Sequence, residues 1–311
     1  VMLRPTAPDF LRFSQTNQMI ATYGGSEANV AVSLANFGIP TEFVTRLPDN
    51  AVARACIASL RANGLGTEGI VFGGKRMGLY FLESGAAFRY SNVVYDREAS
   101  SIAKLRPGMN DWEKIFSDAG WFHWSGIAAA LSQDGADACR EALEIADRMG
   151  LTISCDLNFR KKLWNYGSSA AEVMQPLVQY SDVIFGAEPE YKEILGIQPA
   201  GFKAVDAEDT TFEANLPAFE DFGRRVVELV PRCQKAFLEL RNSITSNHNL
   251  LAAILYSDNT LKHTGVYDIE CEVDRVGAGD AFVGGMIYGL ITYPDNDQKA
   301  LEYALSASDL M

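Results

Sequence analysis

A glycine-containing segment near the C-terminus has the residues best suited to phosphate chemistry. Residues 274–282 read DRVGAGDAF, a strand-like stretch precedes them, and a helical pattern begins within the glycines. Backbone N–H groups in the first turn of a helix have no intrahelical partner, and together with the helix dipole they bind phosphate. Gly277 and Gly279, on either side of Ala278, allow the backbone to approach a phosphoryl group closely. The segment therefore predicts a phosphate site.

Asp280 follows these glycines and is expected to project from the first helical turn toward the same point. A carboxylate beside a bound phosphate accepts the proton of a substrate hydroxyl as the phosphoryl group is transferred. The alternative is an ordinary helix N-terminus, where an aspartate stabilises only the dipole. The four residues GAGD alone leave both interpretations open, whereas the longer string favours catalysis.

Two other glycine-containing segments are less suitable for binding phosphate. Residues 64–69 match GxGxxG, but a predicted helix precedes them and a predicted strand follows, the reverse of the dinucleotide-binding order. Residues 69–76 approach the P-loop pattern, but Arg76 occupies the position of the Ser or Thr that binds magnesium. We reject both interpretations and expect Gly64 to end a helix.

Strand-like and helix-like segments alternate along most of the chain. This alternation predicts an α/β fold with a doubly wound, mostly parallel sheet and helices on both faces. The expected strands are Gly120–Ser125, Leu151–Leu157, Asp182–Phe185, Lys235–Leu240 and Leu250–Tyr256, and the expected helices include Gln133–Met149, Val276–Ile291 and Asp297–Leu310.

Residues 75–97 depart from this alternation. Gly78–Glu83 and Phe88–Tyr95 are both strand-like, and a Gly85-Ala86 turn separates them without a helix. A hairpin inserted in an α/β fold is typically an excursion such as a lid or a dimerisation flap.

The composition excludes several classes of function. The chain has 311 residues, 48% of them hydrophobic, and a net charge of −13, which makes nucleic acid a poor partner. The five cysteines are scattered without a CxxC pair, so neither a disulfide framework nor a zinc site is predicted. Since the sequence has no apolar run of membrane-spanning length and no signal-peptide core at its start, we expect a cytoplasmic protein.

The string DRVGAGDAFVGG resembles the C-terminal signature of the PfkB, or ribokinase-like, carbohydrate kinases, whose usual form begins DTxGAGD; Arg275 replaces the common Thr. Residues 24–31, GGSEANVA, are similar to the family's N-terminal GG…N motif, which contacts the sugar through residues matching Gly25 and Asn29. Because both motifs occur, and in the family's order, a chance match is a poor explanation. The resemblance implies a single ribokinase-like domain over residues 1–311, with a small β-sheet lid from about residues 8–23 and 75–97.

Within the family, the chain is most similar to the 2-keto-3-deoxygluconate kinases. The shared pieces include MLR at residues 2–4, VYDR at 94–97 and DLNFR at 156–160. The resemblance implies phosphorylation of the substrate 6-hydroxyl by ATP with Mg²⁺, with Asp280 as base. It also implies a substrate pocket that, besides Asn29, is lined by residues Gly25, Tyr80, Tyr95, Arg97, Ile127 and Arg160.

The two arginines suit this substrate, because a planar guanidinium binds a sugar-acid carboxylate through two parallel hydrogen bonds. By position alone, Arg97 is equally well explained as a solvated hairpin charge. Arg160 follows a strand's C-terminal end, where α/β sheets bind ligands. A kinase for a neutral sugar such as fructose or ribose remains an alternative, as does a non-catalytic sugar-binding regulator, although the intact Asp280 counts against the latter.

The metal and nucleotide assignments rest on weaker matches. The family's NxxE motif, associated with magnesium, aligns with residues 187–190, where Ala187 replaces the Asn and only Glu190 carries over. Arg241 and Ser243 fall in the nucleotide-binding region, which lacks the usual glycine-rich form, so they either contact ATP with Gly277 and Gly279 or form a surface loop.

Two expectations concern the whole assembly. Exposed strand edges in the lid favour pairing with a second copy, so we expect a homodimer or larger homo-oligomer. Family members have a buried strand before the segment that matches MLR and a longer C-terminal end, so we also expect further terminal residues.

Overall fold

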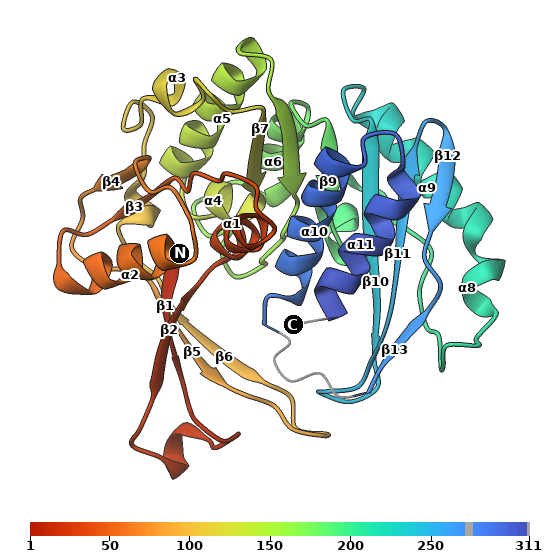
Figure 1. Ribbon diagram of the computed structural model, residues 1–311, viewed down its shortest axis with the longest axis horizontal. Helices are drawn as coiled ribbons and strands as arrows, with labels where there is room; N and C mark the ends of the chain where they lie inside the picture. The colour runs from red at the N-terminus through yellow and green to blue at the C-terminus, as the bar shows by residue number, and fades with distance from the viewer. Residues whose placement is uncertain (271–275, 310–311) are drawn as a thin grey trace.

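The computed structural model describes residues 1–270 and 276–309, so Asp274 and Arg275 of the motif, and Leu310 of the last predicted helix, lie outside the described residues. The central element is a mixed sheet whose strand order is β12-β11-β10-β9-β8-β7, with β13 also paired to β11 (Figure 1). Strands β7, β8, β9 and β10 are parallel to one another, and β11 is antiparallel to β10, β12 and β13. The bounds are β7 (Trp121–Ser125), β8 (Thr152–Asp156), β9 (Val183–Phe185), β10 (Lys235–Ser243), β11 (Asn249–Ser257), β12 (Thr260–His263) and β13 (Tyr267–Ile269).

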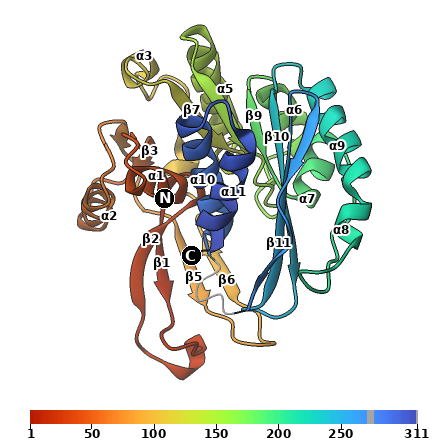
Figure 2. The same ribbon diagram turned by 45° about the vertical axis from the view of Figure 1, so that its right-hand side comes forward.

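Helices cover both faces of this sheet, as predicted (Figure 2). One face carries α1 (Ser26–Asn36), α10 (Ala278–Thr292) and α11 (Asp297–Asp309), and the other carries α5 (Gln133–Arg148), α6 (Ala170–Val178) and α9 (Leu216–Leu229). Shorter helical segments connect them: η1 (Phe13–Gln15), η2 (Ile102–Lys104), α3 (Trp112–Ile115), α4 (Gly126–Ala130), α7 (Glu188–Glu190), η3 (Tyr191–Leu195) and α8 (Thr211–Ala214). None of the helices in the described ranges is long and apolar enough to span a membrane.

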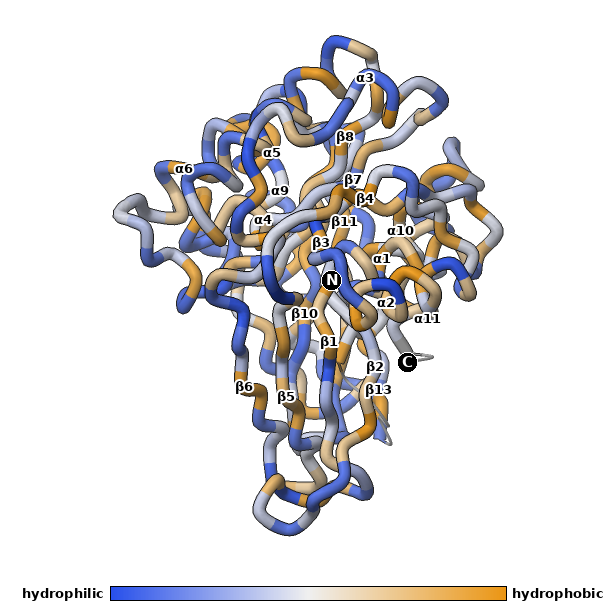
Figure 3. The backbone as a smooth tube through the Cα atoms, turned by 90° about the vertical axis from the view of Figure 1, so that its left-hand side faces the viewer, coloured by the Kyte–Doolittle hydropathy of each residue, from blue (hydrophilic) through white to orange (hydrophobic). Residues whose placement is uncertain are grey.

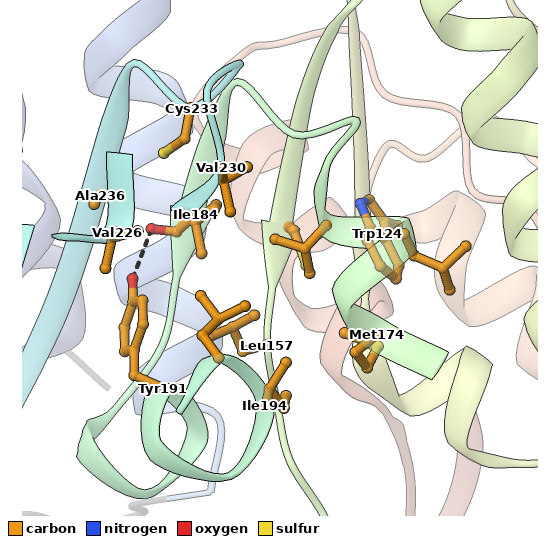
Figure 4. Close-up of a cluster of buried hydrophobic side chains, with 14 of the residues drawn as sticks. Trp124, Leu157, Met174, Ile184, Tyr191, Ile194, Val226, Val230, Cys233 and Ala236 are labelled. Atoms are coloured by element: carbon orange, nitrogen blue, oxygen red, sulfur yellow. Dashed lines mark hydrogen bonds between the residues drawn. The ribbon is translucent and has the colours of Figure 1, made fainter. Parts of the chain in front are cut away.

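Separate apolar cores stabilise the two helical layers. On one face, Phe185 and Phe237 of the sheet stack at 5.0 Å and pack with Phe282 and Met286 of α10. On the other face, the cluster in Figure 4 includes Tyr191, whose hydroxyl donates to the carbonyl oxygen of Ile184 at 3.2 Å. Because α10 has buried residues on all its sides, its N-terminal turn is held firmly against the end of the sheet.

A second sheet projects from the α/β body as a narrow extension of mixed hydropathy (Figure 3). Its strand order is β2-β1-β5-β6, formed by β2 (Ile20–Gly24), β1 (Met2–Thr6), β5 (Leu79–Glu83) and β6 (Asn92–Asp96). The hairpin predicted between residues 78 and 95 is confirmed as the antiparallel pair β5–β6. The sheet also contains β1, which the sequence analysis did not identify as a strand of the projection.

The rejected GxGxxG match has the predicted surroundings. Helix α2 (Ala51–Ala62) precedes it, β4 (Ile70–Phe72) follows, and β4 pairs in parallel with β3 (Thr45–Leu47). Gly64 has a φ of 85°, the left-handed conformation that ends a helix. The segment therefore has no helix N-terminus that faces a phosphate.

Candidate active site

The N-terminus of α10 lies at the centre of the candidate site. Gly277 is its N-cap residue with a φ of 109°, a left-handed conformation that glycine adopts without strain. Ala278 opens the helix, and a Cβ added to Gly279 would meet the Glu239 carboxylate at 3.4 Å, an ordinary contact. The arrangement leaves the first N–H groups of a long, buried helix available to an anion.

Asp280 lies in the first turn of α10 and faces helix α1. The Asn29 side-chain amide donates to its carboxylate at 2.6 Å, and the hydroxyl of Ser26 lies close enough to affect its pKa. Burial is the main cause that raises the pKa of Asp280 to about 6, and the neighbouring Asn29 amide and Ser26 hydroxyl oppose that shift. A carboxylate with this pKa is largely ionised at neutral pH and takes up a proton readily.

The glycine pair before α1 allows this helix and the small sheet to meet. A Cβ on Gly24 would lie 2.5 Å from the hydroxyl of Tyr80, so the observed position of Tyr80 requires a glycine there. The backbone N–H of Gly25 donates to the Asn29 Oδ1 at 3.3 Å. That bond turns the Asn29 Nδ2 toward Asp280, and one asparagine thus connects the GG turn with the predicted base.

Three predicted substrate residues lie together on the projecting sheet. The rings of Tyr80 and Tyr95 stack with their centroids 6.1 Å apart, and the guanidinium of Arg97 lies 4.4 Å from the centroid of Tyr95. Tyr80 is buried, whereas 47% of Tyr95 is exposed. Burial and the nearby charge of Arg160 lower the pKa of Arg97, which places the two arginines near one another.

Arg160 also lies near a group of carboxylates. Its Nη1 lies 3.5 Å from a carboxylate oxygen of Glu190, and its charge also acts on Asp156 and Asp280. Burial is the main cause that raises the pKa of Asp156, and the negative charges of Glu190 and Asp280 raise it further. Burial is also the main cause of the raised pKa of Glu190. The arrangement is a half-exposed cation beside several partly neutralised acids.

Glu190 fits a limited role toward Mg²⁺. Its second carboxylate oxygen accepts from the backbone N–H of Ala187 at 2.7 Å, and Glu239 lies close enough to affect its pKa. In the described ranges, no three His, Cys, Asp or Glu side chains form a group able to hold a metal ion. Mg²⁺ commonly binds one or two carboxylates and takes its other oxygens from substrate phosphates and water, so a single glutamate is compatible with it.

Ile127 belongs to the short helix α4, which follows β7. It lines one end of a cavity of about 1250 Å³ together with Gly25 and Arg97. Most of this cavity follows β7 and the segment before β3, and Asp280 is not among the residues that line it. The cavity therefore adds Ile127 to the region of the sugar-binding residues without locating the catalytic step.

Arg241 and Ser243 lie in a strand, whereas residues 244–248, in the same polar stretch, form the turn between β10 and β11. Both belong to β10 and pair with Leu251 and Asn249 of β11. Arg241 lies 3.2 Å from the Glu239 carboxylate. The ion pair holds the Arg241 side chain beside the Glu239 carboxylate. The assignment of Arg241 to the nucleotide stays a prediction.

The structure adds residues that the sequence analysis did not assign to the site. Asp156 and Asn158 lie in the DLNFR segment, whose position directly after a strand was a usable signal. Glu239 interrupts an apolar strand and pairs across the sheet with Ala187. Ser26 gave no signal, since a serine at a helix N-terminus is common.

Comparison with known proteins supports the same assignment. The family model for "pfkB family carbohydrate kinase" matches residues 10–219, more than half of the chain. The solved structure of 2-dehydro-3-deoxygluconokinase from Thermotoga maritima is 38% identical with a TM-score of 0.91, covering 99% of this chain and 90% of that one. The 2-dehydro-3-deoxygalactonokinase of Haloferax volcanii is 28% identical, covering 99% of this chain and 87% of the relative. Fructokinase-1 of Oryza sativa subsp. japonica is 27% identical, covering 91% and 78%. The chain belongs to the pfkB family of carbohydrate kinases, which transfer a phosphoryl group from ATP to a sugar.

Proposed function

We propose that this kinase phosphorylates the 6-hydroxyl of 2-keto-3-deoxygluconate, the compound also named 2-dehydro-3-deoxygluconate. The observation that carries the proposal is the proximity of Arg97 and Arg160 beside two tyrosines. The 38% identity to a 2-dehydro-3-deoxygluconokinase supports the same substrate.

Two neighbouring guanidinium groups repel one another, and the repulsion is costly where one of them is largely removed from water. A carboxylate bound between them offsets that repulsion and accepts several charge-assisted hydrogen bonds. The chain has 40 acidic and 27 basic residues, so two arginines that act on one another are an uncommon arrangement for the protein. A sugar acid provides the required carboxylate, whereas a neutral sugar does not.

The chemical step follows from the position of Asp280 beside the α10 N-terminus. The backbone N–H groups around Gly277, Ala278 and Gly279 hold the transferred phosphoryl group, and the Asp280 carboxylate accepts the proton of the 6-hydroxyl. A bond forms between the sugar oxygen and the γ-phosphorus, the bond to the β-phosphate oxygen breaks, and ADP leaves. Glu190 would hold Mg²⁺, which would supply positive charge to the phosphates when bound. Arg241 and Ser243 are proposed to contact the nucleotide from β10.

The projecting sheet is proposed to act as a lid over the sugar and as the surface on which two copies meet. It carries Tyr80 and Tyr95, and its outer residues include large exposed apolar side chains such as Ile20 and Val94, which are 57% and 48% exposed. Its terminal strands in the described residues, β2 and β6, have free edges suited to pairing. We propose a homodimer or larger homo-oligomer, and a cytoplasmic location, where ATP is available.

A substrate panel tests the assignment. ADP release is measured with 2-keto-3-deoxygluconate, its galactonate epimer, gluconate, fructose and ribose at equal concentrations. We expect the highest kcat/KM with a 2-keto-3-deoxy sugar acid. A neutral sugar used best would overturn the proposal, and the 27% identity to a fructokinase makes fructose the relevant competitor.

A further inference from the structure

Asn158 is held in an unfavourable state between β8 and the candidate base. It has a φ of 39°, a left-handed conformation that is uncommon outside glycine, and only 4% of it is exposed. Its Oδ1 is buried without a hydrogen-bond partner within the described part of the chain. Both features cost stability, and such costs concentrate at functional sites.

The other side-chain atom of Asn158 makes two hydrogen bonds. Its Nδ2 donates to the Asp156 carboxylate at 2.9 Å and to the hydroxyl oxygen of Ser26 at 2.7 Å. The backbone N–H of Asn158 donates to the other oxygen of the same carboxylate at 3.2 Å, so both oxygens of Asp156 accept from Asn158. These bonds hold the amide with its nitrogen toward Ser26.

This arrangement determines where the Ser26 proton points. A hydroxyl has one proton to donate, and the oxygen of Ser26 already accepts from Asn158. Ser26 is the first residue of α1 and is 92% buried, so bulk water does not compete for the proton. The Ser26 hydroxyl lies close enough to the Asp280 carboxylate to lower its pKa, and Asn29 donates to the same carboxylate at 2.6 Å from one helical turn further along α1.

We infer that Asn158 and Ser26 are positioning residues, in which the Asn158 amide orients the Ser26 hydroxyl and that hydroxyl holds the Asp280 carboxylate toward the substrate. The inference rests on the proposed role of Asp280 as the base. Neither residue touches the reacting atoms. The network connects the C-terminal end of β8 with the N-termini of α1 and α10, three elements that meet only in the folded protein.

Charged and titratable groups from several elements surround Asp280 and also affect its pKa. Glu27 faces it from α1, Tyr80 from β5, Asp156 from β8 and Arg160 from the loop after β8. None of these is altered by a change at Ser26. The hydroxyl donates to the ionised form of Asp280, so its loss moves the acid limb of the pH profile to higher pH.

The test compares Ser26→Ala, Asn158→Gly and the double variant with the wild type. We expect Ser26→Ala to lower kcat about tenfold, with KM for the sugar little changed and the acid limb of kcat/KM displaced upward. Asn158→Gly retains the left-handed backbone and should displace the limb in the same direction. In the Ser26→Ala background, Asn158→Gly should add nothing to that displacement, because it acts through the hydroxyl.

The controls separate positioning from folding and from the proposed function. Ser33→Ala removes a hydroxyl from the same helix away from Asp280 and should leave kcat and the profile unchanged, whereas Ser26→Thr restores the donor and should recover both. A Ser26→Ala profile that coincides with that of Ser33→Ala overturns the inference. If Ser26→Ala does not fold, an undisplaced profile in Asn158→Gly overturns it instead. Normal turnover in Asp280→Asn would show that Asp280 is not the base. That result is distinguishable from the two outcomes that overturn the positioning role.

Discussion

The side-chain amide of Asn29 donates to the Asp280 carboxylate at 2.6 Å, joining two residues 251 positions apart. Asn29 belongs to the N-terminal GG…N segment and Asp280 to the C-terminal GAGD segment. Each segment alone is a helix N-terminus with an ordinary explanation, and their contact brings the residues of the two motifs together in one candidate site.

Replacement of Asp280 by Asn tests the base. The variant keeps the size of the side chain and an acceptor for Asn29, but it cannot take up the proton. Loss of a general base typically lowers the rate by about 10²–10⁴, so kcat should fall within that range. Binding of the sugar, measured by calorimetry, should stay close to that of the wild type, and near-normal turnover would remove Asp280 from this role.

The same variant should be more stable than the wild type at neutral pH. A folded-state pKa of about 6 against an ordinary value of 3.8 means that the folded protein holds this proton more tightly than the unfolded chain. Stability therefore falls as the pH rises between about 4 and 6, by up to about 3 kcal/mol at 1.36 kcal/mol per pKa unit. Thermal melts should show a larger advantage for Asp280→Asn at pH 7 than at pH 4, and an equal difference at both would contradict the shift.

The pH dependence of the wild-type kinase follows from the same carboxylate. Only the ionised form of Asp280 accepts the substrate proton, so kcat/KM should decline below about pH 6, the pKa that burial produces. The measurement is ADP release at low substrate from pH 5 to 8, with the coupling system checked separately. A profile that stays level to pH 5 would show that a group of lower pKa limits the reaction.

Substitution of Arg160 by Met tests the carboxylate site. A charge-assisted hydrogen bond contributes about 1.5–3 kcal/mol, so kcat/KM for the sugar acid should fall at least tenfold. A neutral sugar should lose much less, and the affinity for ATP should stay unchanged. Arg54→Met, which alters an exposed arginine paired with Asp49, is the matched control.

Equal losses for the acid and the neutral sugar in Arg160→Met would assign Arg160 to structure. The ion pair with Glu190 would then be its main role.

A pair of glycine variants tests the packing of α9 on the sheet. A Cβ on Gly223 would lie 2.2 Å from the Cβ of Tyr256, and neither atom can move without displacing backbone. Gly223→Ala should destabilise the protein by about 1–3 kcal/mol despite the higher helix propensity of alanine. Gly120→Ala, whose Cβ would meet nothing within 4 Å, should melt close to the wild type.

The sequence by itself determined the elements whose signals are local. The alternation of apolar segments predicted the α/β fold with helices on both faces, and the hairpin at β5–β6 was visible because a short turn joins two strand-like runs. A local signal also excluded the GxGxxG match as a dinucleotide-binding site, because a helix precedes these glycines and a strand follows them. The short edge strand β12 was not identified, because its four residues, TLKH, contain a single apolar side chain and so carry no alternation.

The tertiary structure decided what depends on register and on contacts between distant segments. Glu239 lies beside Ala187 because β10 is the neighbour of β9 in the sheet. The order of strands in a sheet cannot be predicted from the residues of either segment. Arg97, which follows β6, and Arg160, which follows β8, come within range of each other's charge only in the folded protein. The left-handed backbone of Asn158 likewise turns its side-chain amide toward Ser26. A residue type and its neighbours predict the chemistry a side chain has available, but the direction in which it points is determined by packing across hundreds of positions in the chain.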